Sequence, residues 1–135
     1  MRKLRQIDDH LWCSGKYSMS ELAQLHVVQV VDLRDSHRKP LLVAKTYGRI
    51  GMDYHHVPTC ENVRFTLPHF ESIMDIVKTR PTLIHCWKGV HRTGTFQALY
   101  RIHRQGWSCE DARQELVTNG FGSIDNHLEL WGSVC

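Results

Sequence analysis

One cysteine and one arginine within residues 85–94 have the spacing needed for phosphoryl transfer. Cys86 follows a short apolar run, and Arg92 opens a run with helical periodicity, so a loop is expected to join a strand to a helix. Such a loop can direct successive backbone N–H groups into one concavity that suits a phosphate dianion. Gly89 permits the tight backbone turn that this cradle requires. We therefore expect an anion-binding cup in the sequence His85-Cys86-Trp87-Lys88-Gly89-Val90-His91-Arg92-Thr93-Gly94.

Cys86 is the expected nucleophile of this cup. The positive end of the helix dipole and the charge of Arg92 both favour the thiolate over the thiol, and the thiolate is the reactive form. The planar guanidinium of Arg92 can hold two phosphoryl oxygens at once, whereas a lysine would supply charge without that geometry. A competing interpretation is a buried, inert cysteine, because cysteine often serves as a small core residue. That interpretation leaves the rest of the pattern unexplained.

The segment resembles the signature of the protein tyrosine phosphatase superfamily, in which His-Cys is followed by five residues, Arg, and Ser or Thr. The matching residues are His85, Cys86, Gly89, Arg92, Thr93 and Gly94. The resemblance implies that His85 orients the cradle and that Thr93 hydrogen-bonds the sulfur and helps it leave. It also implies a phosphate-binding loop made of Trp87, Lys88, Gly89, Val90, His91 and Arg92. The mechanism requires no cofactor and no metal.

The general acid departs from the family pattern, which usually places an Asp in a loop after an earlier strand. The corresponding residues 58–65 contain no Asp. Aligned on the end of the strand before this loop and the apolar residues after it, the acid's position falls on Glu61, which could transfer the same proton. Asp32 and Asp53 are interpreted as structural carboxylates at strand positions. Glu61 is therefore the candidate acid, and a solvated loop residue is the alternative.

The length of 135 residues leaves no room for the loops that build a deep phosphotyrosine slot in larger tyrosine phosphatases. The chain is accordingly similar to compact dual-specificity phosphatases over nearly its whole length. Clustered cations near the cup favour a substrate with more than one negative group. The cations expected there are His37, Arg38, Lys39, Arg64, Lys88 and His91.

The signature also looks like that of atypical dual-specificity phosphatases of plants and fungi, a group associated with inositol pyrophosphates. Val90 stands where that group tends to place a lysine, and Trp87 also differs from it. The expected substrate is therefore a phosphorylated protein first and a small polyanionic phosphate, such as an inositol phosphate, second. A catalytically weak, phosphate-binding pseudophosphatase is the alternative, and the missing Asp is the feature that favours it.

Three further hypotheses follow from the same residues. An RNA 5′-triphosphatase ranks low because no basic surface interleaved with aromatic residues is evident, so no nucleic-acid partner is expected. Sulfur or arsenate chemistry uses a similar cysteine-to-arginine spacing on other folds, but the Thr-Gly after Arg92 fits a phosphatase better. Cys60, beside Glu61, could join Cys86 in a protective disulfide on oxidation.

The segments around the cup predict an α/β fold with a single mostly parallel central sheet flanked by helices, forming one phosphatase-like domain over residues 1–135. Strands are expected at residues 11–14, 27–31, 53–57 and 82–85. Helices are expected near residues 18–25, after residue 40, from 66 to 77, from 93 to 105, after 108 and from 123. The helix expected after residue 108 should bury Ala112, Leu116 and Val117.

The composition and the cysteine spacing argue against several classes of protein. The net charge of +3 does not by itself indicate nucleic acid, and no apolar run is long enough to span a bilayer. The charged N-terminus is unlike a signal peptide, so a reducing, cytoplasmic location is expected. Five cysteines without a paired Cys-x-x-Cys spacing argue against a disulfide scaffold or a structural zinc. His55 and His56 point to opposite faces of a strand and cannot easily ligate one ion. The sequence indicates no oligomeric state.

Overall fold

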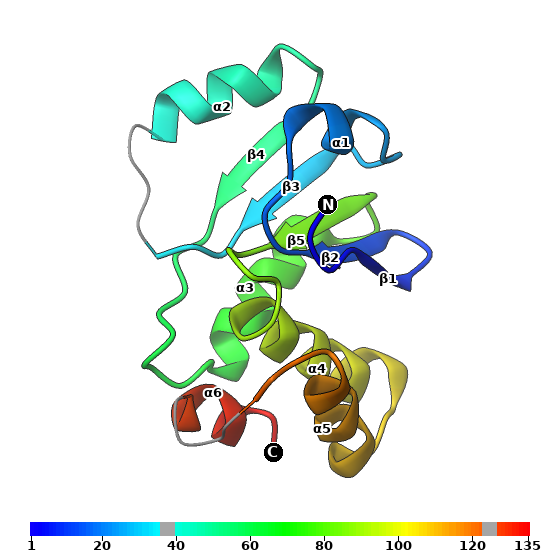
Figure 1. The fold of residues 1–135 in the computed structure, drawn as a ribbon, viewed down its shortest axis with the longest axis vertical. Coiled ribbons are helices and arrows are strands. Elements are labelled where there is room, and N and C mark those ends of the chain that lie inside the picture. The colour runs from blue at the N-terminus through cyan, green and yellow to red at the C-terminus, as the bar shows by residue number, and fades with distance from the viewer. Residues whose placement is uncertain (36–39, 123–126) are drawn as a thin grey trace.

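The computed structural model describes residues 1–35, 40–122 and 127–135. Strands and helices alternate through most of the chain, as predicted (Figure 1). The strands are β1 Arg5–Asp8, β2 Leu11–Ser14, β3 Gln29–Asp32, β4 Asp53–His56 and β5 Thr82–His85. The helices are α1 Met19–Ala23, α2 Pro40–Gly48, α3 Leu67–Val77, α4 Arg92–Gln105, α5 Cys109–Thr118 and α6 Leu128–Ser133.

The five strands form one sheet in the order β1-β2-β5-β3-β4. Strand β1 pairs antiparallel with β2, and the other neighbours are parallel. The predicted α/β fold with a mostly parallel sheet is thus confirmed. Strand β1 was not predicted, because its four residues carry only one buried position, Ile7. Strand β5 lies at the centre of the order, so the loop that follows it opens at the middle of the sheet's edge.

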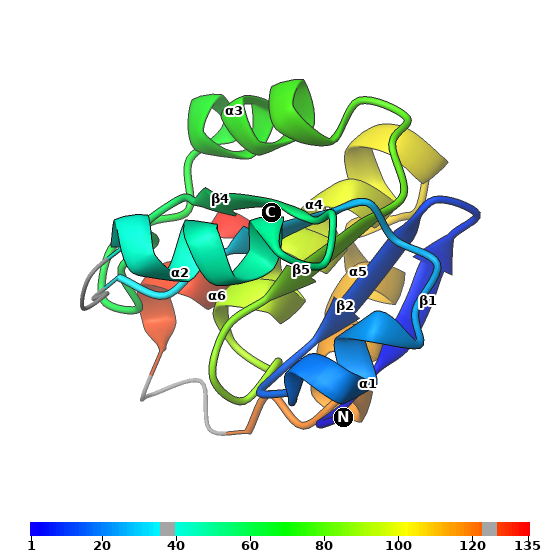
Figure 2. The same cartoon turned by 90° about the horizontal axis from the view of Figure 1, so that it is seen from above.

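Both faces of the sheet are covered. Val31 and Ile84 point to one face and pack with residues of α3, α4, α5 and α6. Val30 and Leu83 point to the other face and pack with Leu22 of α1 and with residues of α2. Figures 1 and 2 show the same two layers of helices on either side of the strands. A strand buried on both sides is apolar without alternation, which explains the continuous run that predicted β3.

The helix ends follow from capping residues. Ser18, Thr66 and Ser108 accept hydrogen bonds from the backbone N–H groups of the first turns of α1, α3 and α5. Gly106 ends α4 in the left-handed conformation. Within the described residues, no helix is both long and apolar enough to cross a membrane.

One helix prediction needs correction, and another lies partly outside the described residues. Val117 of α5 is 47% exposed, while Ala112 and Leu116 are buried as expected. The apolar stripe of α5 therefore does not extend to its last turn. The predicted start of the last helix at Ser123 lies outside the described residues, and the described part of α6 begins at Leu128.

A disulfide joins Cys109 at the start of α5 to Cys135, so the argument against disulfides was wrong for this pair. The two cysteines are 26 residues apart in the sequence, and only the packing of α6 against the helical layer brings them together. Nearby, Ser133 of α6 accepts a hydrogen bond from the backbone N–H of Phe65 at 2.7 Å. The end of the chain is thus fixed both to α5 and to the segment that precedes α3.

Replacing both Cys109 and Cys135 by serine is expected to lower the free energy of unfolding by about 2–4 kcal/mol, because the open chain regains conformational freedom in the unfolded state. Urea unfolding with and without a dithiol reductant measures the effect. The reductant should destabilise the wild type and leave the double variant unchanged. Equal responses of the two proteins would contradict the disulfide.

Candidate active site

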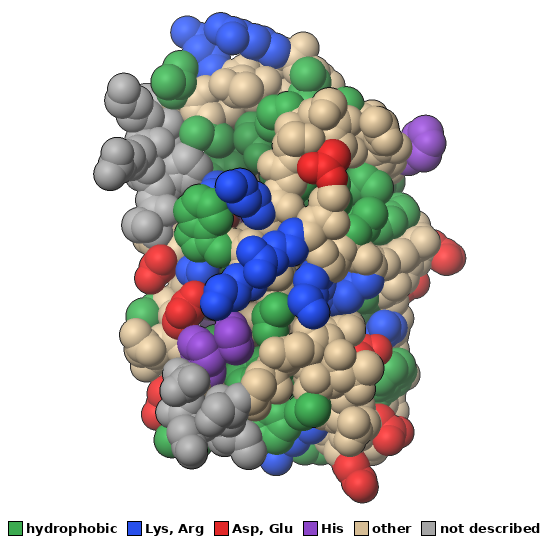
Figure 3. Space-filling view, viewed as in Figure 1, with side chains coloured by type: hydrophobic (Ala, Val, Ile, Leu, Met, Phe, Trp, Pro, Cys, Tyr) green, Lys and Arg blue, Asp and Glu red, His purple; other side chains and the backbone are tan. Residues whose placement is uncertain are grey.

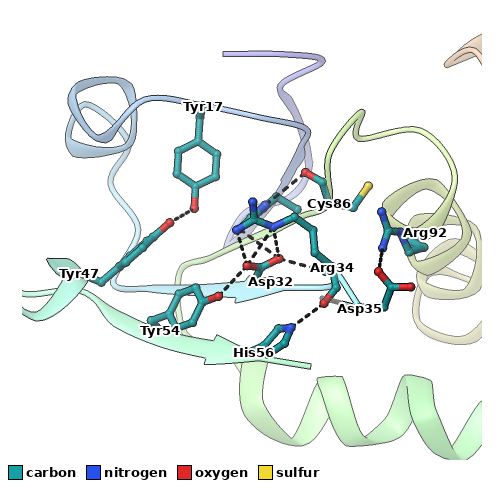
Figure 4. A network of polar contacts seen from close by, with 10 residues as sticks. Tyr17, Asp32, Arg34, Asp35, Tyr47, Tyr54, His56, Cys86 and Arg92 are labelled. Atoms are coloured by element: carbon teal, nitrogen blue, oxygen red, sulfur yellow. Dashed lines mark hydrogen bonds and ion pairs between the residues drawn. The ribbon is translucent and has the colours of Figure 1, made fainter. Parts of the chain in front are cut away.

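The loop from Cys86 to His91 joins the central strand β5 to α4, at the carboxyl edge of the parallel strands where such folds place their sites. It opens on a cavity of about 290 Å³. The residues that line this cavity are Glu61, Cys86, Trp87, Lys88, His91, Arg92 and His127. Cys86 and Arg92 are each 3% exposed, and Figure 4 shows the sulfur directed toward the side on which the guanidinium lies. The sequence-predicted nucleophile and phosphate clamp therefore share one cavity.

The carbonyl groups of the loop are held by the surrounding frame. The carbonyl of Trp87 accepts from the backbone N–H of Lys16 at 2.8 Å, and the carbonyl of Gly89 accepts from Arg5 Nη2 at 2.8 Å. Among the described residues, the backbone N–H groups from residue 87 to residue 92 have no backbone carbonyl as a partner. With its carbonyls bound on the outside, the loop has its amides available for an anion, as expected for an anion-binding nest.

Two glycines permit this arrangement. Gly89 has a φ of +73°, and a Cβ atom at this position would lie 2.3 Å from the backbone nitrogen of Gly15. A Cβ atom on Gly15 would in turn lie 2.5 Å from the carbonyl carbon of Lys88. The loop therefore packs backbone against backbone on the turn after β2. The role of Gly89 was predictable from the loop's own sequence, whereas that of Gly15 was not, because its partner is distant in the sequence.

Helix α4 begins at Arg92, so the positive end of its dipole faces the cavity. Thr93 is fully buried, and its hydroxyl has no hydrogen-bond partner among the described residues. Val90 is only 7% exposed and packs in the core, so only its backbone can contribute to the loop's anion site.

Cys13 is the other buried free thiol, and burial raises its pKa to about 12. Of these two thiols, only Cys86 lines the cavity.

Two carboxylates meet the guanidinium of Arg92. Its Nη2 lies 2.9 Å from Oε1 of Glu61, and its Nη1 lies 3.4 Å from Oδ1 of Asp35. The carbonyl of Thr59 is also 3.4 Å from Nη1. The structure thus brings the candidate acid Glu61 to the cavity, as predicted. Sequence reasoning missed Asp35, although its place just after a buried strand was a usable signal.

Beneath the loop, Asp32 at the end of β3 is fully buried and accepts several hydrogen bonds (Figure 4). Arg34 Nη2 and the hydroxyl of Tyr54 each donate to it at 2.6 Å. Oδ1 of Asp32 also lies 3.9 Å from Nε2 of His85. Burial alone would raise the pKa of Asp32, but the hydrogen bonds from Arg34 and the charge of His85 outweigh burial and hold it well below its usual value. Asp32 therefore has the structural role that the sequence predicted.

Aromatic rings surround the mouth of the cavity. Trp87 is 50% exposed, and the guanidinium of Arg34 lies 4.6 Å from the centre of its ring. The rings of His91 and His127 stack with their centres 3.7 Å apart. Burial and the neighbouring His127 lower the pKa of His91 to about 4, so His91 is neutral at pH 7. The sequence does not predict the approach of His127 to His91, because this contact depends on the packing of α6.

Some residues that were predicted to lie near the cup do not line its cavity. Arg64 and Cys60 line a separate hollow of about 320 Å³ beside the cavity, together with His69. The disulfide between Cys60 and Cys86 on oxidation stays a prediction. The cations His37, Arg38 and Lys39 lie outside the described residues. Among the described residues, no three His, Cys, Asp or Glu side chains are grouped so that they could hold a metal ion.

The central sheet, the loop after β5 and the Cys86–Arg92 pair define a compact phosphatase of the dual-specificity and protein tyrosine phosphatase type. Residues 15–129 match the model of the family described as DSP-PTPase phosphatase fused to NAD+ kinase. The chain belongs to this family.

Individual relatives agree with this assignment. The dual specificity protein phosphatase TpbA of Pseudomonas aeruginosa is 48% identical over 46 residues, which are 34% of this chain and 21% of TpbA. The chain thus matches only about a fifth of that relative's length in sequence. The crystal structure of TpbA has 27% identity and a TM-score of 0.79, covering 98% of this chain and 83% of TpbA. A variant of TpbA has been solved in complex with phosphotyrosine, and it has 28% identity and a TM-score of 0.77 over 98% of this chain and 82% of that one.

A more distant likeness is one of fold alone. The core catalytic domain of the PP-IP phosphatase SIW14 from S. cerevisiae has 18% identity and a TM-score of 0.82, covering 98% of this chain and 83% of that domain.

The Asp32→Asn variant tests the buried carboxylate below the loop. At pH 7 we expect a loss on the order of 3 kcal/mol in the free energy of unfolding, because one partner of a buried ion pair loses its charge. The folded-state pKa is depressed, so the stabilisation is present above the unfolded pKa of about 4 and is lost as pH falls below it. The difference between the variant and the wild type should therefore shrink from pH 4 toward pH 2, as measured by urea unfolding. Asp53→Asn, at an exposed pair with Arg80, is the matched control and should have a much smaller effect. A difference for Asp32→Asn that stays constant down to pH 2 would contradict the assignment.

Proposed function

We propose that this chain hydrolyses phosphate monoesters through a phosphocysteine intermediate. The observation that carries the proposal is the placement of a buried thiol and a buried guanidinium on one cavity, below a loop whose amides are available for an anion. A phosphoryl dianion in this cavity would receive hydrogen bonds from the loop and a bidentate contact from Arg92. The negative charge of the transition state would thus be stabilised by groups that are already in place.

In the first step, the Cys86 thiolate attacks phosphorus, an S–P bond forms, and the P–O bond to the leaving group breaks. Glu61 takes up a proton from solvent once it has left Arg92 and donates that proton to the departing oxygen, which leaves as an alcohol or phenol. The side chain of Glu61 is 42% exposed at the cavity, so it can move between Arg92 and the leaving oxygen. The approaching dianion competes with Glu61 for Arg92, which releases the carboxyl group for this task.

In the second step, water attacks the phosphorus of the intermediate and the Glu61 carboxylate takes the proton of that water. The S–P bond breaks, inorganic phosphate forms and the electron pair returns to sulfur. The buried hydroxyl of Thr93 can donate a hydrogen bond to the returning thiolate, and it has no other partner among the described residues. His85, at the end of β5 and beside Asp32, is a positioning residue for the loop.

Phosphorylated protein is the favoured substrate, and a polyanionic phosphate such as an inositol phosphate is the second candidate. The exposed ring of Trp87 at the rim can pack on an aryl group, in line with the phosphotyrosine bound to TpbA. Lys88 and His91 also line the cavity and could meet a second phosphate, and SIW14 is described as a PP-IP phosphatase.

The cytoplasmic location that the sequence predicted stays a prediction. The disulfide between Cys109 and Cys135 weighs against it, because such bonds persist mainly in oxidising compartments.

A phosphate-release screen over phosphopeptides, p-nitrophenyl phosphate and inositol polyphosphates tests the proposed reaction. The wild type should hydrolyse the aryl phosphates, and Cys86→Ser should lose activity by at least about 10⁴-fold, as expected when a nucleophile is removed. Cys60→Ser is the matched control and should keep the activity. A wild type that binds phosphopeptide without releasing phosphate would support the pseudophosphatase instead.

The Glu61→Gln variant tests the general acid. Alkyl phosphates need a protonated leaving group, so their kcat/KM should fall by about 10²–10⁴-fold. p-Nitrophenyl phosphate releases a stable anion and should lose less than about 10-fold. Asp35→Asn, at the other carboxylate beside Arg92, should lower kcat/KM for both substrates by the same factor. If Glu61→Gln also affects both substrates equally, or affects neither, Glu61 is not the acid.

A further inference from the structure

A group of cations lies outside the catalytic cavity but next to its loop. Figure 3 shows Lys and Arg side chains gathered in a band across the middle of one face of the molecule, beside a pair of His side chains. We define the basic band as the exposed residues Arg2, Lys3, Lys16 and Lys88, of which Arg2 and Lys16 line one hollow and Lys88 lines the catalytic cavity. All four are exposed, and none has a carboxylate partner among the described residues.

Backbone hydrogen bonds fix the band to the cup. The N–H of Lys16 donates to the carbonyl of Trp87 at 2.8 Å, and the N–H of Arg2 donates to the carbonyl of Lys16 at 3.0 Å. Two successive backbone hydrogen bonds therefore link Arg2 to the loop, and the Lys and Arg side chains take no part in them. The band is thus a fixed extension of the catalytic surface, with charges that remain available to a ligand.

The band ends in a second hollow of about 350 Å³, which Arg2 and Lys16 line together with Tyr17 and Glu21. Glu21 is already engaged, because its carboxylate caps α1 by accepting from the backbone N–H of Ser18 at 2.9 Å. Lys88 lines the catalytic cavity, so the cations form a path from one hollow to the other.

From this path we propose that the basic band binds acidic residues of a polypeptide that flank the phosphorylated residue. The proposal rests on the proposed function, and it names the substrate as an extended acidic segment. A compact polyphosphate in the catalytic cavity would meet Lys88 and His91, but Arg2 and Lys16 line a different hollow. Only a ligand that leaves the cavity and continues along the surface can use all of these charges.

The aromatic residues near the band argue against single-stranded nucleic acid as the occupant. Such ligands need rings on which successive bases stack. The ring of Tyr17 packs edge-on against His85 and its hydroxyl contacts that of Tyr47, so Tyr17 is not a stacking platform. Trp87 is a single exposed ring at the rim of the cavity, whereas successive bases need several rings. An acidic peptide needs only the charges, which are present.

The test compares two phosphotyrosine peptides that differ only in having Glu or Gln on both sides of the phosphoresidue. The wild type should show a kcat/KM at least about 10-fold higher for the Glu peptide at low salt, and the preference should decline at 0.3 M NaCl because exposed charges are screened. Arg2→Glu combined with Lys16→Glu should abolish or reverse the preference. Hydrolysis of p-nitrophenyl phosphate should fall much less than hydrolysis of the Glu peptide, because the backbone N–H of Lys16 remains in the variant. This difference separates the proposal from the proposed reaction itself.

Lys45→Glu combined with Arg49→Glu is the matched control, because it makes the same change in net charge on and beside α2, away from the cup. This variant should keep the preference for the Glu peptide. Arg2→Gln with Lys16→Gln gives a milder change and should lower the preference without reversing it. The same charge variants, made in the Cys86→Ser background, should bind the labelled Glu peptide with affinities that rank in the same order as their peptide preferences. Fluorescence anisotropy measures these affinities.

Four outcomes would overturn the proposal. The first is equal rates for the two peptides, and the second is an equal loss of preference in the Lys45/Arg49 control. The third is a faster reaction with a 5′-phosphorylated oligonucleotide than with the Glu peptide. The fourth is retention on phosphatidylserine vesicles that depends on Arg2 and Lys16, without any peptide preference. The last two would assign the band to nucleic acid or to a membrane surface.

Discussion

The contact on which the site depends is the docking of the loop after β5 onto the turn after β2. Gly15 and Gly89 let two backbones approach more closely than any side chain would allow, and the N–H of Lys16 then binds the carbonyl of Trp87. With its carbonyls held from outside, the loop has its amides left for the cavity. Because these dipoles are fixed before a ligand arrives, little reorganisation is needed when charge develops there.

The guanidinium of Arg92 is the second constraint, since a buried charge needs partners. Glu61 and Asp35 supply them from two different loops. In the proposed reaction a phosphoryl group would take over these contacts, so that binding the substrate and releasing the carboxylates would be one event. This competition would tie the position of Glu61 to the occupancy of the cavity, and it would give a glutamate in place of the usual aspartate a route to the leaving oxygen.

The extent to which the sequence predicts the site depends on how local each feature is. Cys86, Gly89 and Arg92 lie on one loop, and the flanking strand and helix each have a clear period, so both the cup and its place in the fold were predictable. Gly15 and His127 reach the site through pairing or packing of distant segments, which a single sequence does not specify. The same reason explains why β1 and the disulfide at Cys109 were missed: a short edge strand has little apolar pattern, and cysteine spacing says nothing about how α6 packs.

The two kinds of positive charge near the cup differ in what they can do. Arg92 is buried and paired with carboxylates, so in the proposed reaction it would contribute only after these carboxylates are displaced. The cations of the basic band are exposed and unpaired among the described residues, so they attract an anionic ligand at a distance and with little desolvation. An acidic segment drawn to the band would raise the local concentration of its phosphoresidue at the cavity, where the dianion must then compete for Arg92. Long-range attraction would thereby help to offset the cost of breaking the ion pair with Glu61, so the band and the cup would act in sequence on one substrate.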